Sequence, residues 1–175
     1  MRGVRWPAAT AGICLSLLAL TLGHLAPLTV QATATGDTYV SLSPVRLLDT
    51  RADGETLGAN ASLNLQVVGI AEVPATATAV AINVTATDTT APSFLTVYPT
   101  GEVLPLSSNL NWGPGDTVAN LAIVPVGTGG EVTLYNSNGD VDVVVDLQGY
   151  FLPSGDSGGD YVPLTPQRIT DTRAG

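Results

Sequence analysis

Short runs of alternating apolar and polar residues follow one another along most of the chain. In the run 62–69, SLNLQVVG, the apolar residues Leu63, Leu65 and Val67 alternate with serine, asparagine and glutamine. The run 79–88, AVAINVTATD, alternates Val and Ile with Asn and Thr in the same way. Successive side chains of a β-strand point to opposite faces, so this period of two predicts strands with one buried face.

Further runs are rich in β-branched or aromatic residues and are bounded by Gly, Pro, Asn or Asp, which is typical of strands and turns. Together with the two runs above, they predict an all-β fold: a single, jelly-roll-like β-sandwich of about eight antiparallel strands. The additional runs are 39–42, 45–50, 93–100, 117–127, 131–139 and 141–151.

Three details sharpen this prediction. Residues 118–126 and 141–147 are nearly all apolar, which favours central strands covered on both faces. The Asn-Gly pair in NSNGD, residues 136–140, predicts a tight hairpin turn between the last two strands. No window of ten or more residues has the apolar spacing of a helix.

The start of the chain has the pattern of a secretory signal peptide. Two arginines precede a mostly apolar stretch, 11–30, and Ala32-Thr33-Ala34 forms a small-x-small cleavage site. The alternative is a retained membrane anchor, but Gly23, His24 and Pro27 interrupt the apolar stretch. We therefore predict an exported protein that is secreted or associated with the cell wall and free of the membrane after cleavage.

Removal of this segment changes the chemistry that the chain can support. The remainder has no Cys, His, Met or Lys, and its four arginines face fifteen acidic residues, for a net charge of −11. Such a charge repels phosphate backbones and anionic lipid, which excludes nucleic-acid binding. Without His or Cys, Ser-His and Cys-His catalysis is excluded, and zinc, haem and iron–sulfur sites are disfavoured.

A pair of carboxylates is the catalytic alternative that this composition leaves, because such a pair hydrolyses glycosides in other proteins. Nothing in the pattern marks two of the fifteen acidic residues for that role. We predict a non-enzymatic protein with no cofactor; the sequence does not define its oligomeric state.

A repeat divides the chain. YVSLSPVRLLDTRAD at 39–53 and YVPLTPQRITDTRAG at 161–175 are identical at nine of fifteen positions, offset by 122 residues. The organisation predicted is a signal peptide at 1–34, a β-sandwich unit at 35–152, and a Gly/Ser/Asp-rich linker at 153–160. Residues 161–175 then begin a second unit of a tandem array; the alternative is a closing strand of the first domain.

Several further segments share one resemblance. They are SPVRLLDTR, VPATATAVAINVTATD, FLTVYPTG, SNLNWGPGDTVANLAIVPVG, GEVTLYNSNGDVDVVVDLQGYF and the returning YVPLTP-RI-DTRAG. Their succession over residues 39–175 resembles a tandem repeat of secreted and cell-wall-associated actinobacterial proteins. The resemblance implies a surface module with a spacer or adhesive role, and we expect its partner to be a cell-wall glycan or a surface protein. The alternative function is a carbohydrate-binding module.

The repeated phrase R-x-x-D-T-R also predicts a structural clasp. It holds all four arginines that follow the signal peptide. A chain so acidic is expected to use its cations internally, with bidentate Arg–carboxylate geometry. We expect a clasp of Arg46, Asp49, Arg51, Asp142 and Asp146, in which Arg51 contacts Asp146 or Asp142, and Asp49 with Thr50 turns or caps the backbone. The alternative is a site for an external anion.

Two binding hypotheses remain. Side chains with oxygen atoms alternate at Asn136, Asn138, Asp140 and Asp142, a pattern that is compatible with calcium binding. Their spacing is not that of an EF-hand, and a plain turn is the favoured alternative. Trp112, Tyr98, Tyr135 and Tyr150 would stack on sugar rings if they shared an exposed face; closing the ends of the sandwich is the favoured alternative.

Overall fold

The computed structural model describes residues 36–153 and 164–174. The predicted signal peptide and residues 154–163 lie outside them. The elements are β1 (Asp37–Asp49), α1 (Thr50–Asp53), β2 (Ala61–Gln66), β3 (Ala79–Thr87), β4 (Ser93–Pro99), β5 (Leu110–Trp112), β6 (Val118–Pro125), η1 (Thr128–Gly130), β7 (Glu131–Asn136), β8 (Asp142–Pro153) and η2 (Thr172–Ala174).

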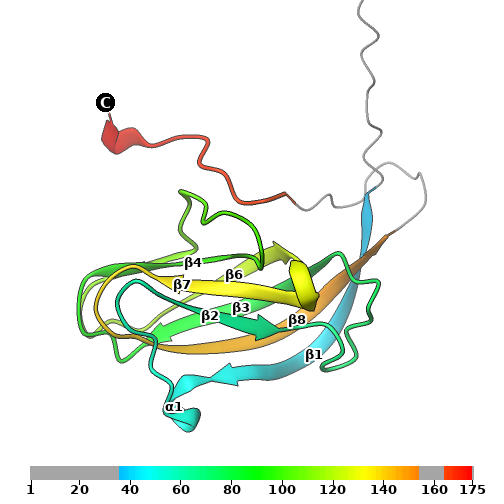
Figure 1. The fold of residues 1–175 in the computed structure, drawn as a ribbon, viewed down its shortest axis with the longest axis horizontal. Helices are drawn as coiled ribbons and strands as arrows, with labels where there is room; N and C mark the ends of the chain where they lie inside the picture. Colours follow the sequence, from blue (N-terminus) through cyan, green and yellow to red (C-terminus); the bar gives the residue numbers. More distant parts are fainter. Residues whose placement is uncertain (1–35, 154–163, 175) are drawn as a thin grey trace, which may run out of the picture. The chain divides into compact units, whose positions relative to one another are not determined.

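The eight strands form two four-stranded antiparallel sheets, ordered β1-β8-β3-β6 and β2-β7-β4-β5 (Figure 1). Strand pairs therefore nest as 1 with 8, 2 with 7, 3 with 6 and 4 with 5, as in a long hairpin folded over on itself. This is the strand order of a jelly roll. The all-β, jelly-roll-like sandwich predicted from the sequence is confirmed.

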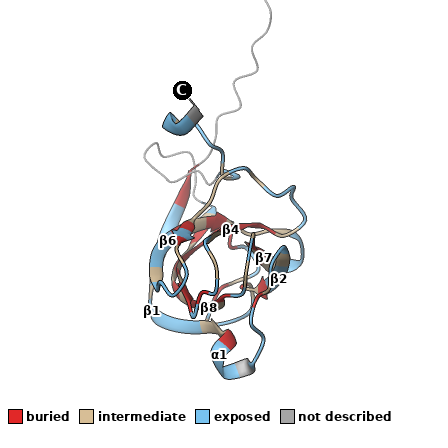
Figure 2. Ribbon diagram, turned by 90° about the vertical axis from the view of Figure 1, so that its left-hand side faces the viewer, coloured by how far each residue is buried: buried red, intermediate tan, exposed pale blue. Residues whose placement is uncertain are grey.

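The core lies between the two sheets, where the buried segments face each other (Figure 2). On β3, Val80, Ile82 and Val84 are completely buried, as their alternation with polar residues predicts. From the opposite sheet, Leu95 and Leu134 are equally buried and belong to the same core. No helix in the described part of the chain is long and apolar enough to cross a membrane.

Three local predictions need correction. The runs 39–42 and 45–50 form one strand, β1, interrupted by register shifts, and β5 was not predicted. Strand β6 is at the edge of its sheet, not in the centre. The segment 136–140 is not a hairpin turn, because β7 and β8 belong to different sheets; Gly139 nonetheless has the positive φ, 61°, expected of this turn sequence.

Candidate functional site

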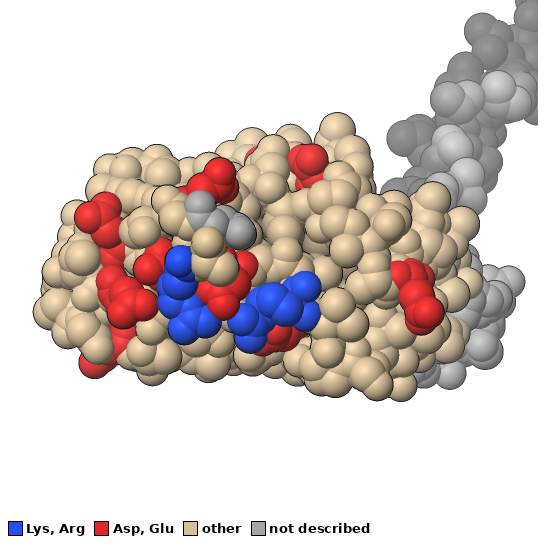
Figure 3. Space-filling view, turned by 90° about the horizontal axis from the view of Figure 1, so that it is seen from below, with Lys and Arg blue, Asp and Glu red and all other residues tan. Residues whose placement is uncertain are grey.

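The predicted clasp begins at an irregularity of β1. A register shift between Arg46 and Leu48 breaks the alternation of faces and leaves Arg46 opposite Asp146 on β8. Arg46 donates from Nε to Asp146 Oδ1 at 2.5 Å and from Nη1 to Asp49 Oδ2 at 2.8 Å. Figure 3 shows positively charged side chains beside carboxylates on one face of the molecule. Arg46 therefore connects the end of β1 to the middle of β8.

Asp49 is the centre of the clasp. Arg51 donates to its two carboxylate oxygens from Nε at 2.8 Å and from Nη2 at 2.7 Å, in the planar fork that suits a carboxylate. The hydrogen bonds from Arg51, with the charges of Arg51 and Arg46, lower the pKa of Asp49 from 3.8 to about 2. Asp49 is therefore ionised at neutral pH and accepts from both arginines.

Thr50 is the buried part of the clasp. It begins the helical turn α1 and is only 1% exposed. Its hydroxyl donates to Asp142 Oδ1 at 2.9 Å and accepts from the backbone N–H of Val143 at 2.8 Å. Thr56 donates to the same Asp142 oxygen at 2.9 Å. The turn after β1 is thus fixed to the start of β8.

All five predicted clasp residues take part in this cluster, but the predicted partner of Arg51 is wrong. Arg51 binds Asp49, and Arg46 takes Asp146. The prediction assumed an extended chain, whereas the register shift and the helical turn redirect both arginines. The backbone does turn at Asp49 and Thr50, as predicted, but Asp49 precedes the helical turn without a side-chain capping bond. An external anion would have to displace Asp49 or Asp146 from these arginines.

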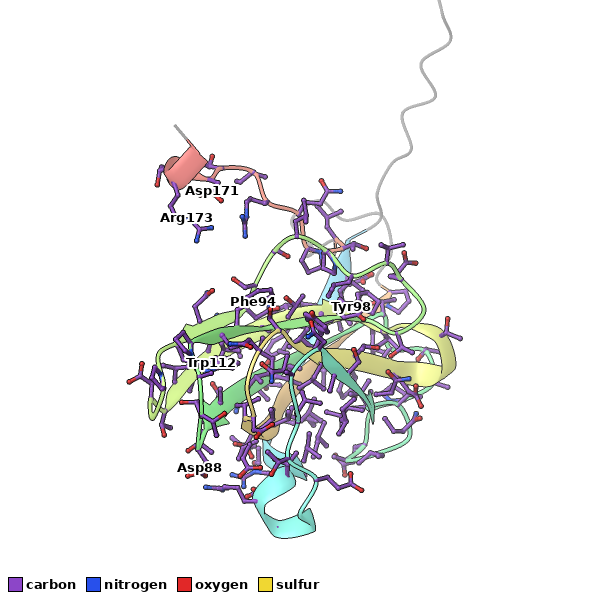
Figure 4. All side chains as sticks on the ribbon, turned by 60° about the vertical axis from the view of Figure 1, so that its left-hand side comes forward. Asp88, Phe94, Tyr98, Trp112, Asp171 and Arg173 are labelled. Atoms are coloured by element: carbon purple, nitrogen blue, oxygen red, sulfur yellow. The ribbon has the colours of Figure 1, made fainter. Side chains whose placement is uncertain are left out.

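The second copy of the phrase builds the same inner cluster. Arg168 Nη1 lies 2.7 Å from Asp171 Oδ2, and Arg173 donates to Asp171 from Nε and Nη2, both at 2.9 Å (Figure 4). The hydrogen bonds from Arg173 hold the pKa of Asp171 well below its usual range. Where Arg46 has the carboxylate of Asp146, Arg168 donates to the backbone carbonyl of Leu106 at 2.9 Å.

The aromatic residues proposed for sugar stacking do not share an exposed face. Trp112 is 7% exposed and Tyr98 9% exposed, both within the β2-β7-β4-β5 sheet (Figure 4). Tyr135 is half-buried, contacts Phe94 at a ring separation of 6.3 Å and donates to Asn60 at 3.1 Å. Tyr150 is partly buried against the core. These contacts favour the structural alternative.

Three of the four side chains proposed for calcium make other hydrogen bonds in the structure. Asn136 is completely buried, and its amide group donates to the carbonyls of Leu57, Gly58 and Gly139. Asn138 donates to the carbonyl of Pro92, and Asp142 accepts from the two threonines of the clasp. In residues 36–153 and 164–174 no group of three or more His, Cys, Asp or Glu could hold a metal ion.

A hollow of about 590 Å³ lies on the outer face of the β1-β8-β3-β6 sheet, and the sequence reasoning missed it. Its aromatic wall is Tyr39, 46% exposed, against Phe151 at a ring separation of 5.1 Å. The ring of Tyr39 lies over Gly149, where a Cβ atom would be 2.6 Å from its Cε2. The remaining lining is uncharged and includes Asn83, Gln148, Leu121 and Ile123.

This hollow explains a signal that was misinterpreted. The apolar run 118–126 predicts a strand covered on both faces, yet on β6 Ala122 and Val124 face the core while Leu121 is 55% exposed. With Ile123, Leu121 contributes apolar surface to the hollow. An apolar outward face on an edge strand was the signal that could have located it.

The comparisons with known proteins add no identification. No protein-family model matches the chain, and a search of the curated proteins finds no match. The resemblance to the actinobacterial repeat therefore stays a prediction.

Proposed function

We propose that the chain is an exported, non-catalytic surface module, one unit of a tandem array with a spacer or adhesive role. The observation that carries this proposal is the second clasp. Arg168, Asp171 and Arg173 repeat the contacts of Arg46, Asp49 and Arg51, 122 residues further along the chain. A phrase that begins one sandwich and recurs with the same inner ion pairs is what the start of a second unit requires.

The proposal is tested by completing the second unit. Residues 53–153 are appended after Ala174, so that the second copy takes the place of β1 in a new sandwich. We expect calorimetry to give roughly twice the enthalpy of unfolding, because this enthalpy scales with the number of folded residues. The matched control carries Arg168→Ala and Thr172→Val in the same chain and should lose stability in the second unit alone. An unchanged enthalpy would contradict the proposal.

The hollow supports a second candidate function, binding of a neutral sugar. Among the described residues, its lining combines the ring of Tyr39 with the amides of Asn83 and Gln148 and contains no charged side chain, although the chain is strongly acidic. A sugar ring needs an apolar platform together with amide donors and acceptors, and this surface supplies both.

Tyr39→Ala is expected to weaken binding to a neutral polysaccharide about tenfold, because the aromatic platform is lost. Affinity electrophoresis in gels that contain glucan, mannan or galactan, and pelleting with purified peptidoglycan, measure this. Tyr135→Ala, on the other sheet, is the matched control and should bind as the unaltered chain does. Equal mobility of all three proteins in every gel, with no pelleting, would eliminate this candidate and leave the spacer function.

A further inference from the structure

The chain carries two versions of the segment that forms the end of β1 and the turn after it. Residues 42–52 and 164–174 are identical at seven of eleven positions. In the first version, Leu42 and Leu47 pack against the core. Their counterparts in the second version, Leu164 and Ile169, are 75% and 96% exposed. The second version therefore has the clasp and the apolar side chains of β1 but leaves those apolar side chains unburied.

Beyond the strand pairing, three groups of β8 bind side chains at the end of β1. Asp146 binds an arginine, and Asp142 with the Val143 N–H binds a threonine four residues further along. The second copy has the same two residues at the same spacing, Arg168 and Thr172. Each of these three groups would thus find its partner in residues 164–174, which correspond to the part of the first copy from Leu42 onward.

The connection is long enough for this segment to reach β8 of its own chain. Leu42 lies beside the stretch of β8 between Gly149 and Leu147, about five residues or roughly 17 Å back from Pro153. Ten residues separate Pro153 from Leu164, and they span up to about 33 Å when extended. A chain that turns back after β8 also runs antiparallel to it, as β1 does.

We propose that residues 164–174 are an alternative occupant of the edge of β8 that β1 holds, within the same chain. Occupation by one segment releases the other. Leu48, which packs against the core, is replaced by Thr170 in the second copy, so β1 is the stronger occupant. The inference goes beyond the proposed function, because it concerns which copy of the phrase pairs with β8 of this unit.

Trypsin reports on this exchange directly. The chain has no Lys, and beyond the predicted signal peptide its arginines are Arg46, Arg51, Arg168 and Arg173, all within the two copies. Cleavage of a native protein follows the population in which the site is open. The rate of cleavage after Arg46 in chains that are still intact after Arg168, measured in short trypsin pulses by mass spectrometry of the fragments, therefore measures how often β1 is released.

The test variant is Thr170→Leu, which strengthens the second copy and leaves β1 and its packing unaltered. We expect cleavage after Arg46 to accelerate about tenfold, because the added leucine favours the competing occupant. The control Thr170→Leu/Asp171→Ala, whose second clasp is broken, should return to the unaltered rate. In Leu48→Thr/Thr170→Leu, protection should move from Arg46 to Arg168.

Two results would overturn the proposal. A rate after Arg46 that Thr170→Leu leaves unchanged shows that the second copy does not compete for β8. An acceleration that grows with protein concentration shows that the copy comes from a second chain, against the assignment to the same chain.

Discussion

Asn136→Ala is expected to lower the free energy of unfolding by about 3 kcal/mol, the largest single effect among the polar residues considered. Asn136 is completely buried at the end of β7. Its Nδ2 donates to the carbonyls of Leu57 and Gly58 at 3.0 Å and of Gly139 at 2.8 Å. Alanine would leave carbonyls from two separate loops without this donor, in a space that the methyl group does not fill.

The side-chain oxygen of Asn136 also accepts a hydrogen bond, and its loss adds to the decrease in the free energy of unfolding. Ser93 donates from its hydroxyl to Asn136 Oδ1 at 2.8 Å and accepts from the backbone N–H of Asn138. The side chain thus ties the loop before β2, the start of β4 and the connection to β8 at one end of the sandwich. Urea unfolding followed by the fluorescence of Trp112, which is itself buried, measures the loss.

Asn138→Ala is the matched control for this prediction. Asn138 is exposed and makes one side-chain bond, to the Pro92 carbonyl at 3.2 Å. Its replacement should change the free energy of unfolding by less than about 0.5 kcal/mol. Calcium ligation predicts the opposite pattern: comparable losses for both variants, and a lower melting temperature of the unaltered chain after addition of a chelator.

The architecture was predictable because it depends on patterns that survive without tertiary information. The alternation on β3 places Val80, Ile82 and Val84 in the core whatever the neighbouring strands are. The order of the strands was not predictable in this way. Strand β5 has only three residues, too few to show a period, and only its pairing with β4 defines it as a strand. The exposed Leu121 on β6 could not be distinguished from a core residue by hydrophobicity alone.

That the five clasp residues lie together was predictable, because the amino-acid composition leaves few arginines and many carboxylates to bind them. An acidic chain that places all its remaining arginines in one phrase has carboxylates available for each of them. The pairing was not predictable, because the register shift after Arg46 changes which side chains share a face. The role of Asn136 was not predictable for a related reason: amide and carboxylate groups around a turn have the same sequence pattern whether they bind a cation or the backbone.

Thr50→Val is expected to lower the free energy of unfolding by about 2 kcal/mol, more than Arg46→Ala lowers it, although the ion pairs are the conspicuous feature of the clasp. Valine matches the shape of threonine but removes the hydroxyl that serves both Asp142 and the Val143 N–H. Val143 is 1% exposed, so its N–H would have no access to water in place of that partner. Urea unfolding of the two variants compares them directly.

The ion pairs contribute less to the free energy of unfolding because, unlike the hydroxyl of Thr50, they are exposed to water. The side chain of Arg46 is 48% exposed, so water competes for its charge and solvates it when the clasp opens. The matched control is Thr172→Val, the same change in the second copy, where the threonine is exposed; it should stay within about 0.5 kcal/mol of the unaltered chain. A greater loss for Arg46→Ala than for Thr50→Val would show that charge, not the buried hydroxyl, fastens β1 to β8. An equal loss for Thr172→Val would mean that residues 164–174 already hold β8 in the resting protein.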